Sequence, residues 1–489
     1  MVTDDVLAEL RRASGTGMKH LGHLRSAFAP DSVAVVGVGP ITAGRFYVES
    51  LIAAGFKGTI YPIHPNGGSV SGLRIYRNLR DVVGPVDLVI SCIPARSVPG
   101  LIRECAAKHV KAVSMFTSGF SETGSQVGRE LEEEIVRIAQ GAGVRLIGPN
   151  CMGIYCPTNG VSFVSDFPRE SGGVGLVCQS GGNTIYLVRL GAERGIRFSK
   201  VISYGNACDV DESDMFEYLT EDSETEVVAA YIEGVKDGEH FQQALSRLAA
   251  RKPVIVLKGG VTREGARTAA SHTSSLAGSE QVWGALLDQA GAIRVNTLCE
   301  LVDMMVTFQF LRWPRGRRVA MVGGGGGASV VATDACALGG FSLPAIPGHV
   351  SKEMRSVLDS DTGLILTNPI ELNMSPEVSY KMAKTMLEYE GFDLMLANCV
   401  FGQAPWPYYD TWVDMFCDTV LKIYAEVSKP VAVVTVSDLI DQERHFAALR
   451  RRYVEAGLPV YDSMSDACLA IDRRMRYGEP RSGSKVLNK

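Results

Sequence analysis

The surroundings of His272 indicate chemistry more directly than any other stretch of this 489-residue chain. The histidine stands in the string Ser-His-Thr-Ser-Ser-Leu-Ala-Gly, and Gly259, Gly260, Gly265 and Gly278 flank it. Serine and threonine add polarity without charge, and glycine lets a loop carry a side chain between sites. We therefore predict an exposed imidazole on a mobile loop. A histidine beside serines can equally be a helix cap or a surface residue.

Three other stretches combine a short apolar run, a glycine turn and the start of a helical pattern. The runs 32–36, 174–178 and 319–322 are followed by the turns 37–44, 179–183 and 323–327. Glycine lets a backbone approach a phosphate closely, and the helix N-terminus that follows attracts its charge. Each turn is therefore predicted to bind a phosphate group. We expect the five glycines at 323–327 to belong to neither a rigid strand nor a rigid helix.

The first of these turns does not match a nicotinamide site. Thr42 stands where the third glycine of G-x-G-x-x-G belongs, and the next apolar run, 59–63, ends in His64-Pro65-Asn66 without an acid for a ribose hydroxyl. Both features argue against a nicotinamide-dependent oxidoreductase.

Alternating strands and helices are predicted to position these residues. Strands are expected at 32–36, 59–63, 86–93, 112–116, 144–147, 174–178, 200–204, 227–232, 253–257, 319–322, 394–400 and 431–436, and helices at 45–55, 184–194 and 328–338. This order predicts an α/β fold with parallel, doubly wound sheets. The loops 92–95, 117–122 and 148–153 would lie at the carboxyl edge of the first sheet, where ligands bind in open α/β sheets.

Composition narrows the class of protein. A net charge of −5 offers no basic surface for nucleic acid, and no apolar run reaches the roughly 18 residues of a membrane span. The N-terminal stretch carries acidic residues where a signal peptide would be basic, so we expect a cytoplasmic protein. The eleven cysteines are scattered without metal-ligand spacing, so we expect reduced thiols and no metal site.

The string around His272 resembles the phosphohistidine segment of the NDP-forming acyl-CoA synthetases, the superfamily that includes succinyl-CoA synthetase. That segment reads close to G-A-x-A-A-x-S-H-T-G-S-L-A-G, and this chain departs from it at Ser274. The loops 92–95, 117–122 and 148–153 are similar to the family's V-P-A, S-A-G-F-S-E and G-P-N-C-x-G loops. Residues 205–211 are similar to G-N-x-x-D-V-D, and 368–371 to N-P-x-D with Glu371 for aspartate.

The resemblance implies an α/β fold with a Rossmann-like CoA-binding domain at 26–157, then two flavodoxin-like, succinyl-CoA synthetase-type domains at 172–312 and 316–475, and a loose tail at 476–489. It also implies that His272 is phosphorylated and that Glu233 hydrogen-bonds and orients the ring, since a carboxylate on one ring nitrogen makes the other more nucleophilic. Glu233 can instead be an ordinary acid at a strand end.

The remaining implied site residues form two sets. The phosphate-binding set, from two helix N-termini that face the histidine's phosphate, is Gln179, Ser180, Gly181, Gly182, Gly324, Gly325 and Gly326. The CoA-binding set is Gly37, Val38, Gly39, Pro40, Ile41, Thr42, Asn66, Cys92, Ile93, Pro94, Gly119, Phe120, Ser121, Glu122 and Asn150. Asn66 stands where the family usually has a lysine suited to a CoA phosphate. The glycines of the first domain can also be tight turns alone.

By this resemblance the chain is the α subunit of an NDP-forming acyl-CoA synthetase, which catalyses acid + CoA + ATP ⇌ acyl-CoA + ADP + phosphate. No stretch reads as an ATP-grasp domain, so an ATP-grasp β-type partner is expected to supply ATP or ADP and Mg²⁺, in an α₂β₂ assembly or a homodimer. The small carboxylic acid is encoded by no motif. The alternatives are a CoA-binding regulatory protein and a nucleotide-independent CoA or acyl transferase on the same fold.

Overall fold

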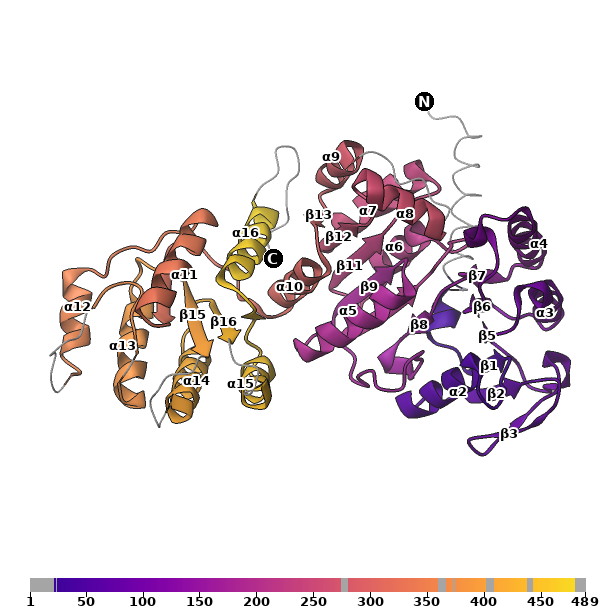
Figure 1. Cartoon of the computed structure of the whole chain (residues 1–489), viewed down its shortest axis with the longest axis horizontal. Coiled ribbons are helices and arrows are strands. Elements are labelled where there is room, and N and C mark those ends of the chain that lie inside the picture. Colours follow the sequence, from indigo (N-terminus) through magenta and orange to yellow (C-terminus); the bar gives the residue numbers. More distant parts are fainter. Residues whose placement is uncertain are drawn as a thin grey trace, which may run out of the picture. The chain divides into compact units, whose positions relative to one another are not determined.

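The computed structural model describes residues 22, 24–273, 280–358, 366–372, 374–401, 409–437 and 443–479. The described residues form two compact units. Unit 1 lies within Met1–Ala192 and Ile196–Leu301, and unit 2 lies within Glu193–Gly195 and Val302–Lys489. Helices and strands alternate in both, so the α/β class is confirmed (Figure 1). No helix in the described part of the chain is long and apolar enough to cross a membrane.

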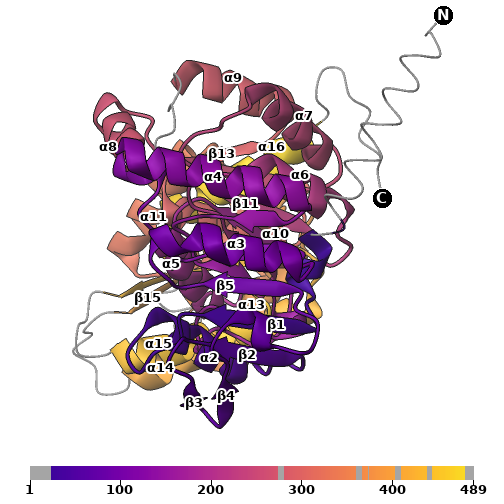
Figure 2. The ribbon, with the colours of Figure 1, turned by 90° about the vertical axis from the view of Figure 1, so that its right-hand side faces the viewer.

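The described residues of unit 1 form two large sheets and a small two-stranded one, and the first large sheet is wholly parallel. Its strand order is β2-β1-β5-β6-β7, and the strands are β1 (Ser32–Val36), β2 (Thr59–Ile63), β5 (Leu88–Ser91), β6 (Ala112–Met115) and β7 (Arg145–Ile147). A hairpin of β3 (Gly68–Val70) and β4 (Leu73–Ile75) follows β2. The helices are α2 (Ala43–Ala54), α3 (Val98–Ala107) and α4 (Gln126–Ala142), with 3₁₀ turns η1 (Leu79–Asp81), η2 (Ala95–Ser97), η3 (Ser121–Thr123) and η4 (Pro157–Asn159). Figure 2 shows α3 and α4 side by side over this sheet, where their apolar faces join its core.

The second sheet of unit 1 has the order β13-β12-β11-β9-β10-β8. Its strands are β8 (Gly153–Tyr155), β9 (Val174–Cys178), β10 (Phe198–Ser203), β11 (Val227–Ile232), β12 (Val254–Lys258) and β13 (Ile293–Val295). Its helices are α5 (Gly181–Glu193), α6 (Glu212–Glu221), α7 (Gly238–Ala249), α8 (Arg263–Thr273) and α9 (Glu280–Ala290), while α10 (Leu298–Phe310) begins in unit 1 and continues into unit 2. Every residue of β9 and β12 is buried, as expected for parallel strands covered on both faces. The edge strand β8 is antiparallel to β10, which the sequence did not indicate.

The described residues of unit 2 form one parallel sheet of order β14-β15-β16-β17. Its strands are β14 (Val319–Gly323), β15 (Leu394–Phe401), β16 (Val431–Ser437) and β17 (Val460–Tyr461). Its helices are α11 (Gly326–Leu338), α12 (Gly348–Arg355), α13 (Pro376–Glu388), α14 (Tyr409–Glu426), α15 (Glu443–Glu455) and α16 (Met464–Gly478). The first residues of the expected tail are therefore helical, and residues 480–489 lie outside the described part.

Candidate active site

The turn between β1 and α2 packs against the end of β5. Gly37 has φ +102°, and a Cβ there would lie 2.5 Å from the carbonyl oxygen of Cys92. Thr42 is the N-cap of α2, and its hydroxyl accepts a hydrogen bond from the backbone N–H of Gly39 at 2.8 Å. Burial raises the pKa of the Cys92 thiol to about 12, which favours the protonated thiol over the thiolate at neutral pH. The predicted residues of this turn and Cys92 therefore meet at one carboxyl edge, where Ile41 is exposed.

The end of β2 lies beside the same turn. The Nε2 atom of His64 is 3.8 Å from a Cβ built on Gly39, and the backbone N–H of Asn66 donates to His64 Nδ1 at 3.3 Å. Arg77, which follows β4, places its Nε 3.8 Å from a Cβ built on Gly67. A guanidinium therefore stands beside the turn where Asn66 replaces the family's lysine. The sequence did not single out Arg77, because its position depends on the β3–β4 hairpin.

The loops that follow β5 and β6 enclose a cavity of about 440 Å³. Its lining is Pro94, Ala95, Arg96, Gly119, Thr123, Ser125, Val127, Gly128 and Leu131. Pro94 and Gly119 were predicted from the sequence, whereas Arg96 and the residues of α4 were not. The cavity offers an apolar wall and one cation at the carboxyl edge of the first sheet.

The predicted residues of the loop after β6 divide into two kinds. Phe120 is fully buried in the core of the first sheet, so only its backbone faces the loop. The Glu122 carboxylate accepts hydrogen bonds from the backbone N–H groups of Gly119 and Phe120 and from Asn206 Nδ2, the last at 2.6 Å. Ser121 Oγ donates to Glu132 at 2.7 Å. Glu122 therefore holds the loop in shape and ties it to the second sheet.

The loop 148–153 connects the edges of the two sheets of unit 1. The backbone N–H of Asn150 donates to the carbonyl oxygen of Thr117 at 2.9 Å, in the loop after β6. The backbone N–H of Met152 donates to Ser203 Oγ at 3.1 Å, and its Cγ lies 3.0 Å from a Cβ built on Gly181. Met152 thus packs against the first residue of α5. The sequence motif contained this residue only as an unspecified position.

The turn 179–183 is held by its own side chains. Ser180 Oγ accepts from the backbone N–H of Asn183 at 3.3 Å, and α5 begins at Gly181, three residues earlier than predicted. Gly181 and Gly182 therefore lie in the first turn of the helix, where backbone N–H groups have no intrahelical acceptor. Gln179 is buried, and its Oε1 accepts from the backbone N–H groups of Glu233 (2.8 Å) and Gly234 (3.3 Å). One amide side chain thus joins the turn to the glutamate.

Glu233 directly follows β11 and is 7% exposed. Its carboxylate accepts a hydrogen bond from the Tyr231 hydroxyl at 3.2 Å. Lys258, at the end of β12, donates from Nζ to the backbone carbonyl oxygen of Glu233 at 2.6 Å. Sequence reasoning missed Lys258; its signal was a lysine that ends an otherwise apolar, buried strand.

The structure corrects the prediction that His272 lies in a loop. The histidine belongs to the last turn of α8. Gly265 was also predicted to lie in the loop, and this prediction is wrong because Gly265 lies in the first turn of the same helix. Thr262 Oγ1 accepts from the backbone N–H of Gly265 at 3.0 Å and so caps the helix start. The arginine- and alanine-rich segment after it favours helix strongly enough to include one glycine. Helix α8 packs against η3, in the loop that follows β6. Ser274 lies outside the described residues.

The aspartates of the 205–211 segment form structural contacts. Arg145, which is buried, pairs at 2.9 Å with Asp209 and at 2.9 Å with Asp214. Asp211 is the N-cap of α6 and accepts from the backbone N–H of Ser213 at 2.8 Å. These acids fasten the start of β7 to the second sheet of unit 1.

The structure also corrects the prediction for the five glycines of unit 2. Gly323 ends β14, and Gly326 and Gly327 begin α11. A Cβ on Gly323, whose φ is +87°, would lie 2.6 Å from the carbonyl oxygen of Asn398, so glycine is required there. A Cβ built on Gly325, Gly326 or Gly327 would meet nothing within 4 Å. This turn therefore presents open backbone at a helix N-terminus.

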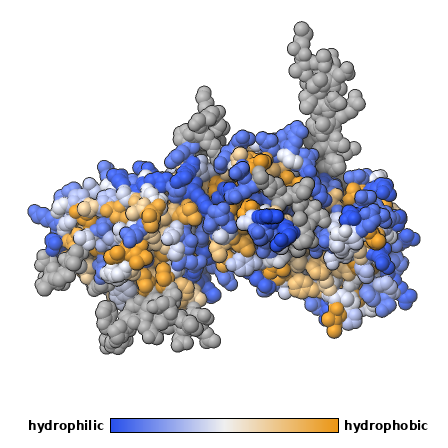
Figure 3. Space-filling model, turned by 45° about the horizontal axis from the view of Figure 1, so that its top comes forward, coloured by the Kyte–Doolittle hydropathy of each residue, from blue (hydrophilic) through white to orange (hydrophobic). Residues whose placement is uncertain are grey.

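Apolar side chains gather on the surface of unit 2. On α11, Val330, Val331 and Leu338 are 63%, 70% and 90% exposed. Figure 3 shows apolar side chains among polar ones on the surface of this unit.

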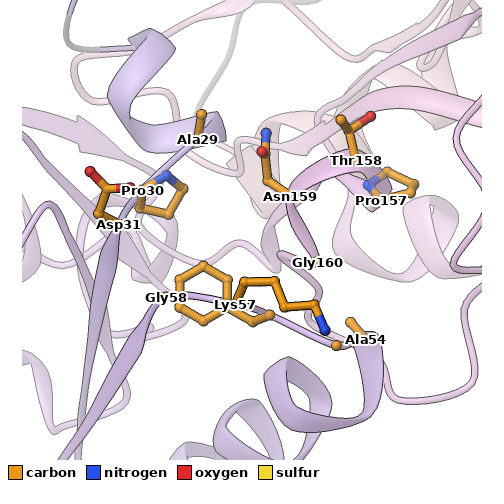
Figure 4. Close-up of a pocket in the computed structure, with 12 residues that line it drawn as sticks. Ala29, Pro30, Asp31, Ala54, Lys57, Gly58, Pro157, Thr158, Asn159 and Gly160 are labelled. Atoms are coloured by element: carbon orange, nitrogen blue, oxygen red, sulfur yellow. The ribbon is translucent and has the colours of Figure 1, made fainter.

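A second cavity, of about 460 Å³, lies at the opposite edge of the first sheet (Figure 4). Three segments line it: 29–31, 54–58 and 157–160. They precede β1, connect α2 to β2, and include η4. This cavity is at the amino edge, away from the loops described above, and is not part of the candidate site.

Comparisons with known proteins agree with this arrangement. Residues 31–157 match a family described as a CoA binding domain, and residues 171–308 match the succinyl-CoA ligase like flavodoxin domain. The chain is 32% identical over 453 residues to the acetate–CoA ligase [ADP-forming] II subunit alpha of Pyrococcus furiosus, covering 91% of this chain and 95% of that protein. It is 36% identical over 327 residues to the corresponding I subunit alpha, covering 65% and 71%.

A solved structure extends the likeness to three dimensions. The dinucleotide forming acetyl-coenzyme A synthetase 1 of Ca. Korarchaeum cryptofilum, in complex with phosphate and ADP, superposes with a TM-score of 0.79 at 29% identity. The superposition covers 93% of this chain and 96% of that chain.

The fold and site thus define a class: an α/β CoA ligase with a Rossmann-like CoA-binding domain followed by succinyl-CoA ligase-type flavodoxin domains. Within this class, the chain belongs to the α-type subunits of the ADP-forming acyl-CoA synthetases. The resemblance stated from the sequence is confirmed.

Proposed function

We propose that this chain joins a small carboxylic acid to CoA through an acyl phosphate and a phosphorylated His272. The observation that carries the proposal is the position of the loop 148–153. Asn150 is bonded to the loop after β6, while Met152 packs against Gly181 at the start of α5. A thioester held at the first site and a phosphate held at the second would therefore adjoin within one compact unit.

The proposed reaction, written toward ATP formation, has three displacements. Phosphate attacks the thioester carbonyl carbon, the C–S bond breaks, and the CoA thiolate leaves and takes up a proton. A ring nitrogen of His272 then attacks phosphorus, the P–O bond to the acyl group breaks, and the carboxylate leaves. The phosphoryl group finally passes from His272 to ADP.

The residues of this chain are assigned roles in those steps. The backbone N–H groups of Gly181 and Gly182 stabilise phosphate oxygens at the helix N-terminus, since charge develops there in each displacement. Glu233 orients the His272 ring and makes its other nitrogen more nucleophilic. Gln179 supports this role, because it bonds the glutamate backbone directly to the phosphate turn. The glycines 324–326, at the start of α11, are assigned to a second phosphate-binding turn.

CoA is assigned to the carboxyl edge of the first sheet. The cavity beside Pro94 and Gly119 suits the apolar parts of CoA, and Arg96 and Arg77 offer cations for its phosphates. An arginine forms bidentate contacts with phosphate, so Arg77 can compensate for the missing lysine at Asn66.

The nucleotide and its Mg²⁺ are assigned to an ATP-grasp partner subunit in an α₂β₂ assembly or a homodimer. Two relatives are named as alpha subunits, which implies a partner subunit. The same relatives are named as acetate–CoA ligases, so acetate is the first acid to test.

Transfer of labelled phosphate to His272 tests the proposal. The purified chain is incubated with acetyl-CoA, or with thioesters of larger acids, and with ³²P-phosphate, with and without an ATP-grasp partner. We expect acid-labile, base-stable label that is absent from His272→Ala and reduced in Glu233→Gln. His349→Ala, an exposed histidine of unit 2, is the matched control and should label like the unchanged protein.

The outcomes separate the alternatives. Label formed from thioester and phosphate shows that this chain holds the CoA, acyl and histidine chemistry, and the thioester that works identifies the acid. Absence of label with every thioester, with and without partner, overturns the phosphohistidine assignment. CoA binding in the absence of label would then indicate a regulatory protein, and thioester exchange without phosphate a transferase.

A further inference from the structure

Lys258 is a buried cation that the proposed relay does not use. It is the last residue of β12 and is 5% exposed. Its Nζ donates hydrogen bonds to the backbone carbonyl oxygens of Glu233, at 2.6 Å, and of Gly259. Burying a lysine costs free energy, so its position beside a predicted catalytic acid requires an explanation.

The two carbonyl oxygens that Lys258 holds belong to different segments. Strands β11 and β12 are parallel neighbours with Ile232 opposite Lys258, so Glu233 and Gly259 are the first residues beyond each strand. Gly259 begins the connection to α8, the helix that contains His272. One ammonium group therefore bridges the segment of the glutamate and the segment of the histidine, beyond the last pair of the β11–β12 ladder.

The remaining surroundings of the ammonium favour the charged form. Nζ lies 5.1 Å from the ring centroid of Trp283 on α9, within cation–π range. Of the charged side chains that the structure describes, Glu233 is the one that acts on Lys258, and the neighbouring Tyr231 hydroxyl donates to the same glutamate.

We infer that Lys258 is a positioning residue of the phosphoryl-transfer site, which holds Glu233 and the β12–α8 turn at the spacing that His272 requires. This inference rests on the proposed function. The lysine acts through the backbone carbonyl oxygens of both segments.

Protonation gives the inference a signature that a merely structural lysine would lack. Burial lowers the pKa of Lys258 to about 8, and the Glu233 carboxylate opposes that shift. Above this pH the amine loses its charge, and charge-assisted hydrogen bonds to the two carbonyl oxygens weaken. The rate of His272 labelling should therefore fall as the pH rises through about 8.

Three variants of the full chain test the inference in the labelling assay. We expect Lys258→Met to lower the labelling rate at pH 7.5 by more than tenfold. Lys258→Arg keeps a guanidinium charge that does not titrate near pH 8, so this variant should label more slowly than the unchanged protein but lose the fall near that pH. Lys200→Met is the matched control: Lys200 is also buried, on β10, but pairs with Glu224, so its loss should lower stability and leave the labelling rate per folded molecule unchanged.

Thermal melting of each variant separates rate from folding. If the unchanged protein does not label, the proposed function fails, and the inference fails with it. If it labels, and Lys258→Met labels within twofold of it with the same pH profile, the inference is overturned. If Lys258→Met does not fold, the pH profiles of the unchanged protein and Lys258→Arg decide: identical profiles overturn the inference, and a fall near pH 8 in the unchanged protein alone supports it.

Discussion

The substitution Gly259→Ala tests how closely Glu233 must be placed. A methyl group at this position would lie 2.7 Å from the Tyr231 hydroxyl oxygen, 3.1 Å from Tyr231 Cζ and 3.3 Å from Glu233 Cγ. The backbone of Gly259 is not in the left-handed region, so alanine adds no conformational strain. Any effect must therefore come from displacement of these two side chains.

The size of the effect follows from these distances. To reach ordinary van der Waals contact, the Tyr231 hydroxyl must retreat by about 0.7 Å, which also disturbs its 3.2 Å hydrogen bond to Glu233. Overpacking of this kind costs about 1–3 kcal/mol of unfolding free energy, which a domain of ordinary stability tolerates. A displacement approaching 1 Å at a catalytic group can slow a reaction by about 100-fold, so we expect His272 labelling to slow by about 10- to 100-fold.

The assay compares labelling time courses and thermal melting for Gly259→Ala and a control. Gly238→Ala is the matched control, because Gly238 starts α7 and a Cβ there meets nothing within 4 Å. Adding Tyr231→Phe removes the atom nearest the new methyl group and should restore part of the rate. If Gly259→Ala loses stability but labels His272 at the unchanged rate, the spacing of Glu233 does not control phosphoryl transfer and the reasoning is wrong.

Three further predictions concern the framework of unit 1. Arg145→Met should cost up to about 3–5 kcal/mol of unfolding free energy in denaturant titrations, because it leaves its two partly buried aspartate partners without a cation. Changing both aspartates to asparagine in the same chain should recover most of the loss. A loss below about 1 kcal/mol would show that water already screens the pairs. Burial raises the pKa of Glu212 from 4.5 to about 8, so between these two pH values the folded state binds a proton that the unfolded state has lost. The unfolding free energy should therefore decrease as pH rises from about 4.5 to 8, by at most about 5 kcal/mol. The same pH series on Glu212→Gln should be flatter, and an unchanged slope would contradict the raised pKa of Glu212. Gly205→Ala should cost about 2–5 kcal/mol of unfolding free energy, because Gly205 has φ +56° and a Cβ there collides with carbonyl oxygens of the loop 148–153. Thioester–phosphate exchange should slow as well. If the variant melts and exchanges like the unchanged protein, the contact between this loop and the second sheet is not tight.

Much of the fold could be predicted from local pattern. Strands were predicted with their observed bounds at Ser32–Val36, Thr59–Ile63, Val174–Cys178 and Val227–Ile232, because a continuous apolar run between glycine turns is typical of a buried parallel strand. Helix starts were less predictable. α5 and α11 begin within the glycines themselves, since the first turn of a helix tolerates glycine where an interior turn does not.

The candidate site was predicted only in part. The motifs identified Glu233 and His272, but the local sequence around His272 was interpreted as a loop, because serines and glycines outweighed the helix-forming arginines and alanines in that interpretation. The roles of Glu233 and His272 remain proposals, which the labelling assay tests.

The sequence by itself determined the residue types, the alternating order of strands and helices, and the family, because each depends on neighbours close in the chain. Only the tertiary structure decided which of these residues meet. Lys258 reaches the backbone of Glu233, Asn206 reaches Glu122, and Met152 packs against Gly181. These partners are far apart in sequence and converge because parallel strands bring successive carboxyl ends to one edge of a sheet, a property of topology that no local pattern contains.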